Sequence, residues 1–70
     1  MENRVLDKRF GAIAIEKGFI TKEQFVEGMA VQIEDDLEGN EHRLIGSLLL
    51  NMGYMTSQQV HEVLEALLAR

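Results

Sequence analysis

The chain contains no cysteine, proline or tryptophan, and only four of its 70 residues are aromatic. Without cysteine, no disulfide can stabilise the fold and no cysteine–histidine pair can supply a nucleophile. Proline is poorly tolerated inside helices, so its absence is typical of a helical chain. A chain of this length is expected to form one domain, residues 1–70, with a small hydrophobic core.

Basic residues are also scarce: seven Lys and Arg face twelve Asp and Glu, and the net charge is −5. General nucleic-acid binding and attraction to an anionic membrane both need a basic surface. We therefore expect neither DNA nor RNA as a partner. Five of the seven basic residues lie in the first half of the chain: Arg4, Lys8, Arg9, Lys17 and Lys22. They indicate a solubilising helix face or, alternatively, a local basic patch.

Long apolar runs are missing as well. No stretch is long enough to span a bilayer, and residues 1–9 carry charges where a signal peptide has its apolar core. These features predict a cytoplasmic protein without membrane insertion. The apolar share of 46% is ordinary for a folded domain and argues against a disordered chain.

Apolar residues recur with the spacing of amphipathic helices, and this spacing predicts four of them. The first helix runs from about residue 4 to 17, and the second follows Thr21 and reaches about residue 37. The third begins near residue 40 or 41 and ends before Gly53, and the fourth runs from Thr56 to the C-terminus. The predicted fold class is therefore all-α.

Two turns share the pattern Gly-apolar-apolar-Thr, at residues 18–21 and 53–56. In each turn the glycine can adopt the left-handed conformation that ends a helix. The threonine is a helix N-cap, and a glutamine three residues later completes a capping box. Each pattern therefore predicts a helix end followed at once by a helix start.

The whole pattern repeats after 35 residues, so that Gly11 matches Gly46 and Phe10 matches Ile45. The first repeat covers about residues 9–35 and the second about residues 44–70. This periodicity predicts two duplicated helix-turn-helix hairpins that bury their apolar sides against each other. The glycines inside the predicted helices, Gly11 and Gly46, indicate either close packing or backbone that is open to a ligand.

Neither a metal site nor a catalytic set is predicted. The acidic connector at residues 34–41 resembles a calcium loop, but the position that needs a bidentate Glu is occupied by Ile45. A metal site made of His42 with Asp35 or Glu38 is the remaining alternative. The chain also lacks a phosphate-binding loop and a plausible nucleophile–base pair. We expect no cofactor and no enzymatic activity.

The two repeats resemble the tandem motif of the N-terminal (MshEN-type) domain of type II secretion and type IV pilus assembly ATPases. The first copy is carried by Arg9-Phe10-Gly11, Ala14-Ile15, Gly18-Phe19-Ile20, Phe25, Met29 and Gln32. The second copy is carried by Leu44-Ile45-Gly46, Leu49-Leu50, Gly53-Tyr54-Met55, Val60 and Leu64. The resemblance covers nearly the whole chain and implies a bacterial protein that shares the fold of this domain.

The resemblance also implies a ligand, because the motifs of that family bind cyclic di-GMP. The residues that it implies as ligand-binding are Arg9, Phe10, Gly11, Gly18, Gln32, Arg43, Gly46 and Gly53. Two hypotheses follow. In the first, the chain is a non-enzymatic module that docks on a partner protein or on itself, since its apolar stripes exceed what four short helices can bury. In the second, it is a receptor for cyclic di-GMP.

Overall fold

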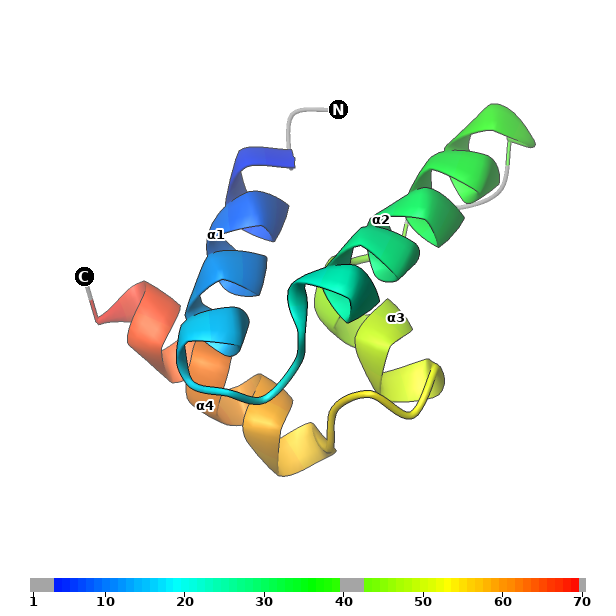
Figure 1. Ribbon diagram of the computed structural model, residues 1–70. Helices are drawn as coiled ribbons and strands as arrows, with labels where there is room; N and C mark the ends of the chain where they lie inside the picture. The colour runs from blue at the N-terminus through cyan, green and yellow to red at the C-terminus, as the bar shows by residue number, and fades with distance from the viewer. Residues whose placement is uncertain (1–3, 40–42, 70) are drawn as a thin grey trace.

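The computed structural model describes residues 4–39 and 43–69, and within these ranges it contains four helices and no strand. They are α1 (Arg4–Glu16), α2 (Lys22–Leu37), α3 (Ile45–Asn51) and α4 (Ser57–Leu68) (Figure 1). The predicted all-α fold class is confirmed. None of the helices in the described ranges has the length and apolarity that a membrane-crossing helix requires.

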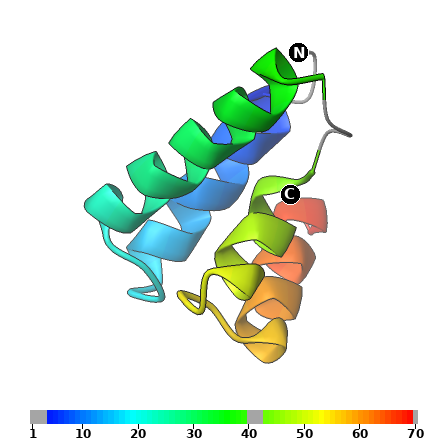
Figure 2. The ribbon, with the colours of Figure 1, turned by 90° about the vertical axis from the view of Figure 1, so that its right-hand side faces the viewer.

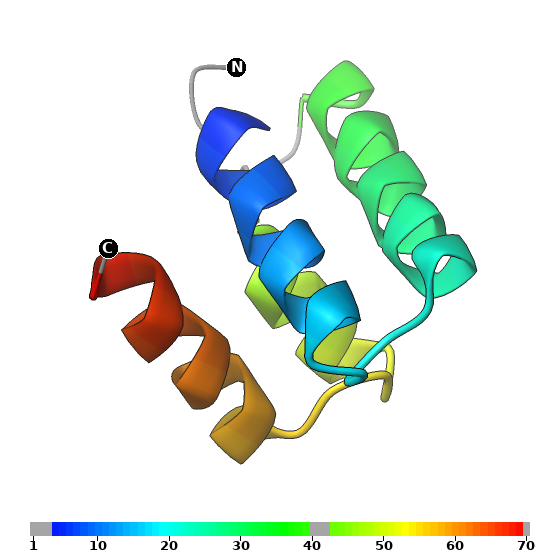
Figure 3. The same cartoon turned by 60° about the vertical axis from the view of Figure 1, so that its left-hand side comes forward.

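The helices form two layers, with α1 and α2 in one and α3 and α4 in the other (Figure 2). The closest approaches between helices cross from one layer to the other, where α1 packs along α4 and α2 packs along α3. Figure 3 shows α1 between α4 and α2, with α3 behind it. The hydrophobic core therefore lies between the two hairpins.

The two predicted turns are confirmed at the level of individual hydrogen bonds. Gly18 and Gly53 have φ angles of 80° and 83°, in the left-handed region where glycine is favoured. The Thr21 hydroxyl accepts a hydrogen bond from the backbone N–H of Gln24 at 3.1 Å, and the Gln24 side chain accepts one from the Thr21 N–H at 2.9 Å. The second capping box, at residues 56–59, has the same two bonds at 3.1 and 3.0 Å.

The start of α3 differs from the prediction. The sequence predicted a start near residue 40 or 41, whereas the helix begins at Ile45 after an extended Leu44 that makes no side-chain cap. The backbone carbonyl of Arg43 accepts a hydrogen bond from the Gln32 side chain at 2.8 Å, which holds this segment out of the helix. Residue 42, of the proposed histidine metal site, lies outside the described residues, as does part of the acidic connector.

Nine apolar side chains form the core of the described chain: Phe10, Ile13, Ala14, Ile20, Ile45, Leu48, Leu49, Met55 and Val63. Many of these buried positions pair at the predicted spacing of 35 residues, for example Ala14 with Leu49 and Ile20 with Met55. The burial pattern favours the duplication, which itself stays a prediction.

Glycines inside the helices lie where other side chains need room. A Cβ atom on Gly11 would clash with the ring of Phe25 from α2. A Cβ atom on Gly46 would lie 3.1 Å from the Phe10 ring and 3.4 Å from Val60. Both glycines are buried, and both make room for side chains of other helices. The close-packing interpretation therefore holds for both positions, with neighbours that sequence alone did not identify.

One hydrogen bond joins the second turn to the first hairpin. The Tyr54 hydroxyl donates to Oε1 of Glu27 on α2 at 2.7 Å. This bond raises the pKa of Tyr54 above its ordinary value of 10.0, with smaller contributions from partial burial and from the negative charge of Glu27. The position 35 residues earlier is Phe19, which has no hydroxyl, so the two hairpins differ here.

We predict that Tyr54 titrates above 10.0 in the native protein and that Glu27→Ala moves this pKa down toward 10.0. The near-ultraviolet absorbance of tyrosinate measures it directly, because the chain has one tyrosine and no tryptophan. Since the folded-state pKa is raised, the stabilisation by this hydroxyl is complete below pH 10 and is lost as pH rises through the folded pKa. The destabilisation caused by Tyr54→Phe should therefore disappear in alkaline solution.

Glu62→Ala is the matched control, since it removes the carboxylate at the position 35 residues after Glu27. It should leave the Tyr54 titration unchanged. An unshifted titration in the wild-type protein would contradict the hydrogen bond.

Candidate functional site

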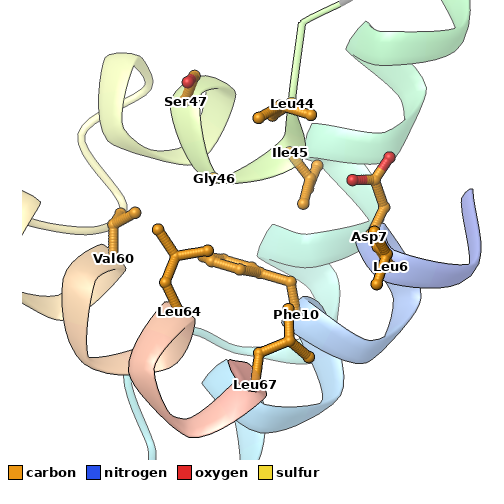
Figure 4. Close-up of a pocket in the computed structure, with 10 residues that line it drawn as sticks. All are labelled: Leu6, Asp7, Phe10, Leu44, Ile45, Gly46, Ser47, Val60, Leu64 and Leu67. Atoms are coloured by element: carbon orange, nitrogen blue, oxygen red, sulfur yellow. The ribbon is translucent and has the colours of Figure 1, made fainter. Parts of the chain in front are cut away.

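An apolar groove lies between the first half of α1, the beginning of α3 and the side of α4 that carries Val60, Leu64 and Leu67 (Figure 4). We call it the α1–α3–α4 groove, and its volume is about 180 Å³. It is lined by ten residues: Leu6, Asp7, Phe10, Leu44, Ile45, Gly46, Ser47, Val60, Leu64 and Leu67. Eight of the ten carry no polar side-chain atom, so the groove is suited to apolar groups.

The groove has a buried floor and an exposed rim. Phe10 and Ile45 are buried at its floor, because they belong to the core between the hairpins. Leu6, Leu44 and Leu64 line the groove with 52%, 57% and 43% of their surface exposed. Three leucines exposed to this extent around one hollow form a contiguous apolar surface of the kind that marks interaction sites.

A buried polar network fixes the segment that carries Leu44. The amide nitrogen of Gln32 donates to Oδ2 of Asp7 at 2.9 Å and to the backbone carbonyl of Arg43 at 2.8 Å. Gln32 is fully buried and Asp7 nearly so. Both partners are acceptors, so only the amide nitrogen can face them, and the orientation of the amide is determined. The network ties α1 and α2 to the residues that lead into α3.

The side-chain oxygen of Gln32 takes no part in this network. Oε1 of Gln32 is buried and has no hydrogen-bond partner among the described residues. A buried polar atom without a partner costs free energy. The two bonds of the amide nitrogen offset this cost, and the charge of the Asp7 carboxylate strengthens one of them.

Arg43 is held by a second contact on the outside of the same segment. Its Nη2 and Nε atoms donate to Oδ2 of Asp35 at 2.6 and 3.0 Å. The guanidinium is thus engaged with a carboxylate of α2. Together with the bond from Gln32 to its backbone carbonyl, this ion pair fixes residue 43 from two sides.

The residues that the resemblance implied as ligand-binding do not converge on one surface. Phe10 and Gly46 meet in the α1–α3–α4 groove. Arg9 is exposed on a different hollow of about 170 Å³, which it shares with Ala12, Ile13, Glu16 and Leu67. Leu67 lines both hollows, whereas Arg9 lines only the second.

The other five residues that the resemblance implied as ligand-binding lie at other places in the fold. Gly11 is covered by Phe25, and Gly18 and Gly53 form the exposed helix-ending turns. Gln32 and Arg43 are in contact, because the Gln32 side chain donates a hydrogen bond to the Arg43 backbone carbonyl. Their side chains do not face a common hollow.

Sequence reasoning missed the residues that shape the groove, chiefly Leu6, Asp7, Leu44 and Leu64. In the sequence, Leu44 and Leu64 belong to the second copy of the motif, and the surplus of apolar residues over what four short helices can bury was the available signal. No sequence signal indicated Asp7, because its partner Gln32 lies 25 residues away. Within the described residues, no group of three His, Cys, Asp or Glu is placed to hold a metal ion.

No protein-family model, curated protein or solved structure matches this chain. The resemblance to the secretion-ATPase domain is therefore carried by the motif residues alone.

We predict that the Asp7–Gln32 pair is coupled. Gln32→Met should destabilise the fold by about 1–3 kcal/mol, because it leaves the Asp7 carboxylate and the Arg43 carbonyl without their donor. Asp7→Leu should also destabilise it, since the amide of Gln32 then lacks one acceptor. The double variant should be more stable than the sum of the two changes implies, because it removes both partners together. Urea denaturation measures each free energy of unfolding.

Gln58→Met, at an exposed position of α4, is the control and should change stability by less than about 0.5 kcal/mol. Strictly additive effects in the cycle would contradict the hydrogen bond between Asp7 and Gln32.

Proposed function

We propose that this chain is a small non-enzymatic interaction module that docks on a partner protein through the α1–α3–α4 groove. The observation that carries the proposal is the rim of half-exposed leucines over a buried apolar floor. The resemblance of the repeats suggests a bacterial protein with a fold like that of the secretion-ATPase domain, and we propose a cytoplasmic setting.

The energetics of the rim support docking. Burial of a whole leucine side chain contributes roughly 1.5–3 kcal/mol, so completing the burial of each rim leucine contributes about 1 kcal/mol. A few such anchors at the centre of an interface supply most of the binding free energy in many complexes. The floor is already packed, so a partner meets a preformed surface and little ordering has to accompany binding.

We predict that Leu64→Asp and Leu44→Asp each abolish partner binding while the protein stays folded, because both side chains already contact solvent. A charge on the rim has to be desolvated when a partner covers it, which costs more than the leucine gained. The measurement is quantitative affinity capture from bacterial lysate with wild-type and variant baits. Sedimentation velocity of the same proteins detects self-association.

Leu37→Asp is the matched control, since Leu37 is 82% exposed at the end of α2 and does not line the groove. The proposal requires a protein that is captured by the wild type and by this control and is lost from both groove variants. Equal capture by all four baits would refute docking through the groove.

The second candidate function is a receptor for cyclic di-GMP, supported by the motif resemblance and by the meeting of Phe10 and Gly46 in one hollow. The geometry supports it less well, because Arg9 lies on a different hollow and Arg43 is engaged with Asp35. Titration calorimetry with the dinucleotide decides between the two functions. If the chain is a receptor, saturable heat appears and Arg9→Ala weakens binding at least tenfold, as expected for loss of a charge-assisted contact. Absence of heat at high micromolar ligand would exclude it.

A further inference from the structure

Helix α2 has a second apolar side, which no other part of the described chain covers. Its inner side, with the buried Gly28 and Gln32, packs along α3. Four apolar residues of its outer side recur every three or four positions and form one row along the helix: Val26, Ala30, Ile33 and Leu37. We call it the α2 apolar row. All four residues are exposed, Leu37 by 82%. Figure 3 shows α2 at the edge of the bundle.

A row of carboxylates runs beside the α2 apolar row. Glu23, Glu27 and Glu34 are exposed, and a turn of about 100° per residue places them next to the apolar row on the helix surface. Helix α2 has five carboxylates and one basic residue, Lys22 at its first position. It therefore accounts for most of the net charge of −5 of the chain. The outer side of α2 thus presents an apolar row and an acidic row in parallel.

We propose that the outer side of α2 binds a basic amphipathic helix of a partner protein. The apolar side of the partner helix covers the α2 apolar row, and its Lys or Arg side chains lie against the carboxylate row. Such charge complementarity selects the partner and its orientation more than it adds affinity, which the apolar contact supplies. This surface is separate from the α1–α3–α4 groove, because no residue of α2 lines the groove.

A second copy of this chain does not offer the required helix. Helices α3 and α4 contain no Lys or Arg, and Leu6 is the one large apolar side chain of α1 that is exposed among the described residues. Two copies that met through the outer side of α2 would bring their carboxylate rows together, and like charges across an interface are unfavourable. An anionic membrane is disfavoured for the same reason.

The test is NMR titration of the uniformly labelled chain with two helix-forming peptides of the length of α2. The first consists of leucine along one side and lysine along the other, and the second has glutamate in place of each lysine. We expect saturable shifts of the amides of Val26, Ala30 and Ile33 with the lysine peptide. The glutamate peptide should bind at least tenfold more weakly.

Variants test the two rows separately. Ala30→Asp places a charge in the middle of the α2 apolar row and should weaken the lysine peptide at least tenfold, because that charge must be desolvated when the peptide covers it. Val26→Asp repeats this test at a second exposed position, should Ala30→Asp fail to fold. Glu23→Lys combined with Glu34→Lys reverses two charges of the carboxylate row and should weaken the lysine peptide at least fivefold.

Glu62→Lys combined with Glu65→Lys is the matched control, since it changes the net charge equally at two exposed positions of α4. At physiological ionic strength it should weaken the lysine peptide less than twofold, because charges far from the contact are screened.

Equal binding of the two peptides, undiminished binding to the α2 variants, or equal weakening by the α4 control would overturn the proposed site. Shifts confined to the groove would also overturn it, and they would instead support docking through the groove. The proposed docking function fails separately, when affinity capture is indifferent to Leu44→Asp and Leu64→Asp.

Discussion

The small size of the hydrophobic core is the constraint on which the rest of this structure depends. The four helices have 13, 16, 7 and 12 residues, so no single pair can bury a large surface. The chain compensates with close approach between helices, and Gly11, Ala14 and Gly46 are small enough to allow it. Packing across the layers then fills the centre but not the periphery. Apolar side chains at the ends of α1 and α4 stay half-exposed, and the groove is the result.

The length of α3 follows from competition for a single carbonyl group. In an α-helix the carbonyl of residue 43 would accept a hydrogen bond from the N–H of residue 47. Here it accepts one from the side chain of Gln32, and the first bond of this kind in α3 runs from the Leu48 N–H to the Leu44 carbonyl. The tertiary bond wins because Gln32 is buried, where an unpaired amide donor is costly. Leu44 is extended as a consequence, and its side chain lines the groove.

The parts of the fold that could be predicted from sequence are those set by local chemistry. Both capping boxes and both helix-ending glycines depend on residues within a few positions of each other, and all were predicted correctly. The start of α3 could not be predicted, because it depends on the hydrogen bond between Gln32 and the Arg43 carbonyl, which are eleven residues apart in the chain. The α1–α3–α4 groove could not be predicted for a related reason. Periodicity identifies the apolar face of a helix, but the part of it left exposed depends on how the hairpins cross.

The motif residues illustrate the same limit. Arg9, Phe10 and Gly11 are adjacent in sequence, yet successive helical residues point in directions about 100° apart. Arg9 therefore reaches one hollow, Phe10 lines the floor of the other, and Gly11 faces Phe25. A sequence motif on a helix can describe one binding surface only if its residues recur every three or four positions. The glycine turns of the motif are required by the fold whether or not a ligand is bound.

The differences between the two halves indicate which half stabilises the fold and which half leaves apolar surface uncovered at the groove. At the place where the first half has Gln32, fully buried and bonded to two other segments, the second half has Leu67, which is half-buried beside both hollows. At the place where the first half has the ring of Phe25 over a glycine, the second has Val60, and Gly46 is covered by the ring of Phe10 from α1. In both cases the first half carries the larger or more strongly bonded side chain, and that side chain fills its place in the fold. If the two halves are the predicted duplicates, this difference divides their roles: the first half supplies stability, and the second leaves apolar surface uncovered at the groove.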